Sequence, residues 1–209
     1  MPRLPILRTI EAFASVQGEG LRQGEPTLFV RMAGCNLRCS FCDTKRAWAR
    51  GHAQTVAEIV GQVRALWRLH PARWVCLTGG EPLRQPVAPL IRALRRDGLS
   101  VQVETNGTFP PRPEADWYTV SPKPPGYEAH PLFKKKAKEV KLIVSRHLTA
   151  DAVREVRRSF PARTPVILQP LGMARWSLRK AARLIEEAAR QGLTNVRVSV
   201  QLHKIYRLK

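Results

Sequence analysis

Short apolar runs alternate along the chain with stretches in which apolar residues recur every three or four positions. The short runs are bounded by turn residues and are typical of buried β-strands. They predict strands over 27–32, 74–78, 99–104, 117–120, 139–144, 165–168 and 195–200. The amphipathic stretches predict helices over 55–69, 87–96, 149–159 and 177–190. This alternation predicts a parallel sheet covered by helices.

The ends of the predicted helices carry recognisable signals. Thr55 and Glu58 form a capping-box pattern, in which a threonine and a glutamate three residues later satisfy backbone N–H groups at a helix start. Ser177 stands at the expected N-cap of the last helix, and Gly192 stands at its expected end. The first and last predicted helices therefore have defined starts.

Two connections between predicted strands are too rich in proline to be ordinary helices. Residues 108–115 contain three prolines, and residues 124–132 contain three prolines and a glycine. The pattern predicts an α/β fold, an incomplete (β/α)6 barrel with degraded crossovers between strands 3–4 and 4–5. An open doubly wound sheet is the alternative. In either fold, functional side chains are expected at the carboxyl ends of the strands.

Composition limits the class of protein further. The chain has 209 residues, of which 44% are hydrophobic, which suits one folded domain and excludes intrinsic disorder as the main description. No apolar run reaches the roughly 18–20 residues of a membrane-spanning helix, and no block recurs at a fixed period. The first residues contain no apolar signal core, so the sequence predicts a cytoplasmic protein.

The chain is strongly basic. Its 36 Lys and Arg residues against 16 Asp and Glu residues give a net charge of +20, of which residues 106–209 carry +13. Such a balance indicates nucleic acid, a membrane surface, an acidic substrate or an acidic partner. The densest basic run, over 134–138, is most simply a solvated loop. No recognised basic motif with interleaved aromatic residues is present, which disfavours nucleic acid.

Three of the four cysteines lie close together, directly after the first predicted strand. Cys35, Cys39 and Cys42 have the spacing Cys-x3-Cys-x2-Cys, whereas Cys76 stands alone in the second predicted strand, where core packing explains it. An odd number of clustered thiols in a cytosolic chain argues against disulfides. A structural zinc ion needs a fourth ligand, for which His52 is nearest. The remaining alternative is a 4Fe–4S cluster on three thiolates, with one iron open to a substrate or cofactor.

The cysteine spacing, with Phe41 directly before the last cysteine, resembles the signature of the radical S-adenosylmethionine (SAM) superfamily. The resemblance implies that Cys35, Cys39 and Cys42 ligate a 4Fe–4S cluster whose open iron binds SAM. It also implies that one electron cleaves SAM to a 5'-deoxyadenosyl radical. The excess of basic residues favours an acidic flavodoxin or ferredoxin as the electron donor. The fold that it implies is the incomplete radical SAM barrel.

Further motifs narrow the resemblance to one family. They cover residues 13–20, 29–37, 41–44, 78–82, 104–108, 121–123 and 201–204. In this order they resemble the 7-carboxy-7-deazaguanine synthases of the 7-deazapurine (queuosine) pathway, over roughly residues 10–204. The resemblance implies a lyase that contracts the ring of 6-carboxy-5,6,7,8-tetrahydropterin. Hydrogen is taken from C6, ammonia is lost, and 7-carboxy-7-deazaguanine forms.

The resemblance implies that the catalytic residues are Cys35, Cys39, Cys42 and Arg31. Arg31 ends the first predicted strand, and its guanidinium fork suits the substrate carboxylate. SAM contacts are implied for Phe41, Cys42, Asp43, Gly79, Gly80, Glu81, Glu104, Asn106, Ser121, Pro122 and Lys123. Gln169, at the end of the sixth predicted strand, is a further candidate for a SAM contact. Pterin contacts are implied for Val16, Gln17, Gly18, Glu19, Arg31, Thr78 and His203. Thr44 is expected to bind Mg²⁺ together with the substrate.

Simpler structural explanations stand beside several of these roles. A pair such as Gly79-Gly80 is commonly a turn, and Asn106 at a strand end commonly forms an Asx turn. A surface ion pair would explain Arg31, and a lone His203 is commonly structural.

The expected organisation is a single radical SAM domain over 1–209. It comprises an N-terminal substrate-binding extension over 1–25, a partial barrel over 26–170, and a C-terminal helix and edge strand over 171–209. The trimmed crossovers and the resemblance favour a homodimer. Two other classes remain open. A glycyl-radical activase would lack the motif at 17–20 and the Asp43-Thr44 pair, and a zinc-containing nucleic-acid-binding protein would contain zinc instead of iron.

Overall fold

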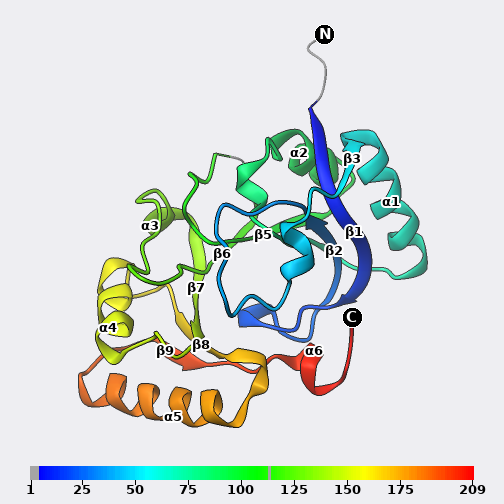
Figure 1. Ribbon diagram of the computed structural model, residues 1–209. Helices are drawn as coiled ribbons and strands as arrows, with labels where there is room; N and C mark the ends of the chain where they lie inside the picture. Colours follow the sequence, from blue (N-terminus) through cyan, green and yellow to red (C-terminus); the bar gives the residue numbers. More distant parts are fainter. Residues whose placement is uncertain (1–4, 113) are drawn as a thin grey trace. The chain divides into compact units, whose positions relative to one another are not determined.

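The computed structural model describes residues 5–112 and 114–209, which divide into two compact units. The first unit comprises the chain up to Val16, Glu25–Thr105 and Pro111–Tyr118. The second unit comprises Gln17–Gly24, Asn106–Pro110 and Thr119–Lys209. Each unit contains parallel strands and helices (Figure 1). The segment Gln17–Gly24 belongs to the second unit although the strands before and after it belong to the first.

The first unit contains a mixed sheet. Its strand order is β3 (His52–Thr55), β1 (Ile6–Val16), β2 (Pro26–Met32), β4 (Trp74–Gly79) and β5 (Ser100–Thr105). β1 runs antiparallel to both β2 and β3, whereas β2, β4 and β5 run parallel to one another. The register of β1 shifts between Thr9 and Glu11, which places Glu11 opposite Arg31 on β2. Such a bulge changes the direction in which neighbouring side chains point.

Two helices, α1 (Val56–Leu69) and α2 (Ala88–Arg96), pack against this sheet (Figure 1). The capping box predicted for α1 is confirmed. The Thr55 hydroxyl accepts from the Glu58 N–H at 3.2 Å, and the Glu58 carboxylate accepts from the Thr55 N–H at 2.6 Å. The short helices η2 (Lys45–Trp48) and η3 (Pro82–Arg84) follow β2 and β4. The fully buried residues that hold this layer together include Leu28, Val75, Leu77, Val101, Ile59, Val63, Leu90 and Leu94.

The second unit has its own parallel strands. They are the end of β6 (Trp117–Val120), β7 (Ala137–Val144), β8 (Val166–Pro170) and β9 (Val196–Val198), in this order. Its helices are η1 (Gly20–Arg22), α3 (Phe133–Lys136), α4 (Ala150–Ser159), η4 (Leu171–Met173), α5 (Arg175–Arg190) and α6 (Leu202–Ile205). The long helix α5 packs along β8 and β9, and α4 packs beside α5 (Figure 1).

Every predicted strand and helix is present, with ends that shift by at most two residues. The N-cap predicted at Ser177 is wrong, because α5 begins at Arg175 and its N-cap is Ala174. The buried Ser177 hydroxyl instead donates to the Val144 carbonyl at 2.7 Å and accepts from the Leu171 N–H at 2.8 Å. The Ser177 hydroxyl therefore links α5 to the end of β7 by a hydrogen bond.

The predicted short crossovers are also confirmed. The described residues between β5 and β6 contain no helix, and those between β6 and β7 contain only the single turn α3. The sequence does not predict β1 or β3. β1 occupies residues expected to belong to the N-terminal substrate-binding extension. Across residues 5–112 and 114–209, no helix combines the length and apolar character that crossing a membrane requires.

Candidate active site

The three clustered cysteines lie on the loop between β2 and η2, just beyond the carboxyl end of β2. Cys35, Cys39 and Cys42 are free thiols and are partly exposed. A tight turn in which the Cys42 N–H donates to the Cys39 carbonyl at 3.0 Å brings the last two together, and the Leu37 N–H donates to the Cys35 Sγ at 3.4 Å. One short loop therefore presents all three sulfur atoms.

Hydrogen bonds attach the start of this loop to η2 and to the segment after β4. The Gly34 N–H donates to the Ala47 carbonyl at 2.7 Å, and the Glu81 N–H donates to the Gly34 carbonyl at 2.9 Å. The Gln85 side chain donates to the Ala33 carbonyl at 3.0 Å. Gln85 is a positioning residue that the sequence analysis missed, because no motif marks it.

Gly79 and Gly80 are required where the two backbones meet. A Cβ at residue 80 would lie 2.0 Å from the Gly34 carbonyl oxygen, and one at residue 79 would lie 2.4 Å from the Met32 carbonyl oxygen. Gly79 also has a φ of +111°, which side-chain-bearing residues rarely adopt. The glycine pair thus allows the cysteine loop to approach the end of β4, whatever further contact it makes with a ligand.

The electrostatics of the loop suit a positively charged group. Burial raises the pKa of the Cys35 thiol, the Leu37 N–H opposes this, and the nearby Glu81, Cys39 and Cys42 raise the pKa further. Coordination of iron, whose positive charge stabilises a thiolate, would offset these effects at Cys35. The donor set is soft sulfur, as iron–sulfur clusters require. The residues present fit a 4Fe–4S cluster.

The arrangement of side chains does not support the alternative of a structural zinc ion. Within the described parts of the chain, no three His, Cys, Asp or Glu side chains are placed to hold one metal ion. A 4Fe–4S cluster differs in this respect, because each thiolate binds a separate iron and the sulfur atoms need not converge on one point. His52, the nearest candidate fourth ligand, lies in β3 opposite Thr9.

Arg31 lies in a row of polar side chains across the sheet of the first unit. The register aligns Glu11, Arg31 and Thr78 on β1, β2 and β4. The Arg31 Nε donates to Glu11 Oε1 at 3.0 Å, and Arg46 also donates to this oxygen. The Arg31 guanidinium lies 5.4 Å from the centre of the Phe13 ring. Arg31 therefore makes the predicted alternative, an ion pair, but the pair is partly buried and holds the guanidinium in a fixed place.

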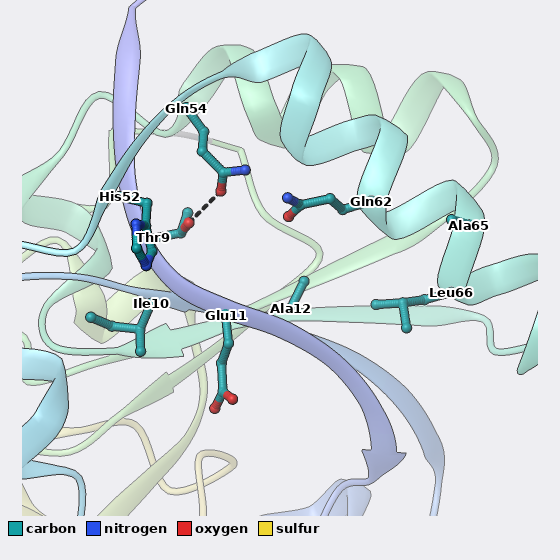
Figure 2. Close-up of a pocket in the computed structure, with 9 residues that line it drawn as sticks. All are labelled: Thr9, Ile10, Glu11, Ala12, His52, Gln54, Gln62, Ala65 and Leu66. Carbon is teal, nitrogen blue, oxygen red and sulfur yellow. Dashed lines mark hydrogen bonds between the residues drawn. The ribbon is translucent and has the colours of Figure 1, made fainter.

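An apolar row crosses the same strands two residues away from this polar row, with Phe13 after Glu11 on β1, and Phe29 and Cys76 before their polar counterparts on β2 and β4. Phe13 and Phe29 stack with ring centres 5.0 Å apart, and Cys76 completes the buried cluster. The prediction that Cys76 is a core residue is confirmed. Because side chains alternate along a strand, Glu11 leaves β1 on the side opposite Ala12, which points toward α1 (Figure 2). The polar row thus occupies the face of the sheet away from α1.

The other expected residues of the first unit lie on the same strand ends or on the cysteine loop. Thr44 follows Asp43, and its hydroxyl donates to the Asp43 carboxylate at 3.0 Å. The Glu81 carboxylate is fully buried and accepts from the Leu83 N–H at 3.0 Å and from the Thr105 hydroxyl at 2.8 Å. The residues not yet placed are Phe41 on the cysteine loop, Val16 at the end of β1 and Glu104 in β5.

The second unit holds the other expected pterin residues. The Gln17–Gly24 segment closes on itself, because the Gly24 N–H donates to the Gln17 carbonyl at 2.8 Å. The Glu19 N–H donates to the buried Gln17 side chain at 3.3 Å. The His203 ring lies against Gly18, where an added Cβ would be 2.2 Å from His203 Nδ1. Gln17, Gly18, Glu19 and His203 therefore lie together in one group.

The expected SAM residues of the second unit lie at strand ends. The Asn106 Oδ1 accepts from the Thr108 N–H at 2.9 Å and hydroxyl at 2.7 Å, which is the Asx turn that the simpler explanation predicts. The Ser121 hydroxyl donates to the Lys141 carbonyl at 2.7 Å, and Lys123 folds back onto the Ser121 oxygens. The next residue, Pro122, is buried.

Gln169 differs from these residues. It lies in β8 and is completely buried, and neither atom of its side-chain amide has a hydrogen-bond partner within the described structure. A buried amide without a hydrogen-bond partner costs free energy, so Gln169 is a candidate to bind a ligand through its side-chain amide.

A pocket of about 530 Å³ lies elsewhere in the first unit, between α1, β1 and β3 (Figure 2). Its lining residues are Thr9, Ile10, Glu11, Ala12, His52, Gln54, Gln62, Ala65 and Leu66. At its edge, the Thr9 hydroxyl donates to the Gln54 side chain. No residue expected to bind the cluster, SAM or the pterin lines this pocket, so it is not the predicted active site.

The strands and the cysteine loop together define a radical SAM protein. The model of the Radical SAM superfamily matches residues 29–117. The crystal structure of QueE from Escherichia coli is similar with a TM-score of 0.79 and 29% identity, over 95% of each chain. Streptococcus suis SuiB shares the fold, with a TM-score of 0.58 and 13% identity, over 80% of this chain and 47% of that one. The α/β fold is therefore the predicted partial radical SAM barrel.

Sequence relatives identify the family within this superfamily. A 7-carboxy-7-deazaguanine synthase from Pyrobaculum aerophilum is 41% identical, over 97% of this chain and 96% of the relative. One from Aquifex aeolicus is 34% identical, over 95% of this chain and 93% of the relative. The chain belongs to the 7-carboxy-7-deazaguanine synthase family. It is a radical SAM enzyme, and the superfamily uses a 4Fe–4S cluster and SAM.

Proposed function

We propose that this protein converts 6-carboxy-5,6,7,8-tetrahydropterin to 7-carboxy-7-deazaguanine, with loss of ammonia, in 7-deazapurine (queuosine) biosynthesis. The observation that carries the proposal is similarity to synthases of this name over nearly the whole chain. No similarity of this kind favours either of the two alternatives, a glycyl-radical activase or a zinc-containing nucleic-acid-binding protein.

Cys35, Cys39 and Cys42 would hold the 4Fe–4S cluster, because they are the three free thiols of one loop at the carboxyl end of β2. When bound, the cluster and SAM supply a carbon radical that takes hydrogen from C6 of the pterin. The hydrogen bonds from Gly34 and Glu81 fix the start of this loop before either group binds. Such preorganisation lowers the cost of holding the reactants in line.

The proposed SAM residues lie on the strand ends of each unit. In the first unit they are Phe41, Cys42, Asp43, Gly79, Gly80, Glu81 and Glu104. In the second unit they are Asn106, Ser121, Pro122, Lys123 and Gln169. Gln169 has the clearest structural support, because its buried amide offers both a donor and an acceptor without partners.

The proposed pterin residues provide two kinds of contact. Arg31 would bind the substrate carboxylate, since Glu11 occupies only its Nε and its two Nη atoms can form a bidentate pair. Val16, Gln17, Gly18, Glu19, Thr78 and His203 would bind the pterin ring and its polar edge. The Arg31 guanidinium lies over the Phe13 ring, and this cation–π contact supports the proposed orientation of the side chain.

We further propose one Mg²⁺ ion bound by Thr44 and the substrate. The Thr44 hydroxyl oxygen keeps lone pairs while it donates to Asp43, and Mg²⁺ takes oxygen ligands largely from substrate and water. A homodimer, a flavodoxin or ferredoxin as electron donor, and a cytoplasmic location complete the proposal. Three free thiols on one loop support a reducing compartment.

Anaerobic conversion tests the function directly. The protein is reconstituted with iron and sulfide and incubated with dithionite, SAM, Mg²⁺ and the carboxypterin. We expect a brown protein that forms 7-carboxy-7-deazaguanine, detected by mass spectrometry, and ammonia in equal amount. Formation of 5'-deoxyadenosine without the deazaguanine would contradict the proposed substrate, and a colourless zinc-containing protein would contradict the enzyme class.

A further inference from the structure

A buried ion pair in the second unit joins β7 to the Gln17–Gly24 segment. The Lys141 Nζ donates to Glu19 Oε2 at 2.5 Å, and their side chains are 5% and 13% exposed. The Gln201 Nε2 donates to the other carboxylate oxygen, Oε1, at 2.7 Å. Each oxygen of the Glu19 carboxylate therefore accepts one hydrogen bond from the protein.

The backbone around Glu19 is held independently of this pair. Glu139, on the same face of β7 as Lys141, accepts from the Leu21 N–H at 2.7 Å and from the Thr119 hydroxyl at 2.6 Å. Gly20 has a φ of +73°, and a Cβ there would lie 2.5 Å from the Glu139 carboxylate, so another residue would be strained and would displace that carboxylate. Glu139 thus fixes the segment, whereas Lys141 acts on the Glu19 side chain.

The other side of the segment is attached near the end of the chain. The Gln23 side chain donates to the Gly18 carbonyl at 2.9 Å and to the Val200 carbonyl at 2.8 Å. The Leu202 N–H also donates to the Gly18 carbonyl at 2.9 Å. These bonds place Gln201 beside Glu19 without help from the ion pair.

Lys141 determines the charge of Glu19. Burial alone would raise the pKa of the Glu19 carboxyl. The charge and hydrogen bond of Lys141, the hydrogen bond of Gln201 and the charge of His203 outweigh burial and hold that pKa at about 2. Glu19 is therefore ionised at neutral pH. A buried ion pair is weak evidence for stability, because desolvation offsets its attraction, so a role for this pair is better sought in function.

The orientation of Gln201 adds an acceptor to this group. Its amide nitrogen must face the Glu19 carboxylate, which leaves its Oε1 buried and without a hydrogen-bond partner in the described structure. Each Glu19 oxygen also retains a lone pair. The surface formed by the Glu19 carboxylate and the Gln201 oxygen is thus rich in acceptors, and it suits a planar ligand edge of adjacent N–H donors.

We propose that Lys141 is a positioning residue that, together with Gln201, holds Glu19 as an ionised acceptor for the N–H donors of the pterin edge. The amino group and adjacent ring N–H of a pterin form such an edge. The Gln201 oxygen is a further acceptor for it. This inference rests on the proposed function, since it takes the pterin as the ligand.

Binding without turnover tests the inference. The reconstituted enzyme is saturated with SAM in the absence of reductant, and the dissociation constant of the carboxypterin is measured between about pH 5.5 and 8.5. Lys141→Met is compared with Lys138→Met, the same change at an exposed position of the same strand. Wild type serves as the reference for ionisation of the substrate itself.

We expect Lys138→Met to bind as wild type does. Lys141→Met should bind about 10- to 100-fold more weakly at neutral pH, as expected when a buried charge loses its partner. Without Lys141, burial raises the Glu19 pKa toward neutrality, so affinity should fall further as pH decreases. In wild type the same group, with a pKa of about 2, titrates below the measured range. Lys141→Arg should restore the flat pH dependence.

Gln201→Leu provides a second, milder test that leaves both charges in place. It should weaken pterin binding about 5- to 10-fold with no new pH dependence, as expected for the loss of hydrogen bonds alone. Circular dichroism and SAM binding check that each variant is folded. Folded Lys141→Met with wild-type affinity and pH profile would overturn the inference. If Lys141→Met does not fold, unchanged binding by Gln201→Leu overturns it. Failure of wild type to bind the pterin would instead reject the proposed function.

Discussion

At the scale of single residues, Glu11 determines which part of Arg31 can meet a ligand. The Glu11 carboxylate takes the Nε–H of Arg31, so the Nη atoms at the other edge of the guanidinium face no acceptor in the described structure. Arg46 shares the same Glu11 oxygen from an exposed position. Arg31 is therefore held by one carboxylate in an orientation suited to receive a second.

Replacing Arg31 separates substrate binding from SAM cleavage. Arg31→Ala should keep its iron and slow substrate-independent SAM cleavage, but it should bind the carboxypterin about 30-fold to several thousand-fold more weakly. Arg31→Lys should recover only part of the lost affinity, because an ammonium group cannot make the bidentate pair with the substrate carboxylate. Titration with the pterin and assay of 5'-deoxyadenosine measure the two properties side by side.

Arg46→Ala is the matched control, since it removes the other guanidinium from Glu11. An exposed ion pair contributes at most about 1 kcal/mol, so affinity should change less than about fivefold. Unchanged pterin affinity in Arg31→Ala would mean that Arg31 is structural and that the substrate carboxylate binds elsewhere.

Two cysteines of different surroundings should respond differently to the same change. Cys39→Ala removes one of the three loop thiols, so it should abolish SAM cleavage after reconstitution with iron and sulfide. Cys76→Ala, in the core beside Phe13 and Phe29, should retain cleavage and lose about 1–2 kcal/mol of unfolding free energy. Iron analysis, 5'-deoxyadenosine assay and denaturant titration check this, and cleavage by Cys39→Ala would refute the cluster assignment.

At the scale of elements, the close packing of the Gly79-Gly80 turn against the cysteine loop has a measurable effect. Gly80→Ala places a methyl group against the Gly34 carbonyl, so it should displace the loop and lower both stability and iron content. Gly61→Ala is the control, because Gly61 lies in α1 with open space around its Cα. That variant should keep its iron and gain up to about 1 kcal/mol of stability from helix propensity. Equal iron content in the two variants would show that the turn does not position the loop.

The elements that the sequence predicts are those whose pattern follows from burial on one or both faces. β4 and β7 are such runs, and the capping box fixes the start of α1. β1 escapes prediction because Arg8, Thr9 and Glu11 interrupt its apolar alternation, and because its register shifts between Thr9 and Glu11. β3 is only four residues long and contains His52 and Gln54, so it has no apolar alternation.

The residues of the candidate site also divide into those that the sequence reveals and those that it does not. Its cysteines and glycines are visible in the sequence because their spacing is local. Glu11, Gln85 and Lys141 are invisible, because each acts through a partner that only the fold brings near, such as Glu19 at a separation of 122 residues from Lys141.

At the scale of the whole molecule, the charge of +20 suits an acidic electron donor. The cysteine loop and the residues after it expose Arg38, Lys45, Arg46 and Arg50 against the single acid Asp43. Electrostatic association weakens as the screening length shortens to about 8–10 Å at ordinary salt. Turnover with flavodoxin or ferredoxin should therefore fall steeply with added salt, whereas turnover with dithionite should fall much less. Equal salt responses would leave the charge without this explanation.

The placement of Gln17–Gly24 in the second unit has a consequence for the order in which the enzyme matures. Synthesis proceeds from the N-terminus, so Glu19 emerges from the ribosome early, whereas its partners Lys141 and Gln201 follow 122 and 182 residues later. Once Tyr118 has been made, every residue of the first unit exists, the cluster cysteines included. The nascent chain therefore contains the cluster cysteines and Arg31 before Lys141 and Gln201, and it depends on nearly complete translation to bring Glu19 together with both of the residues that hold its carboxylate.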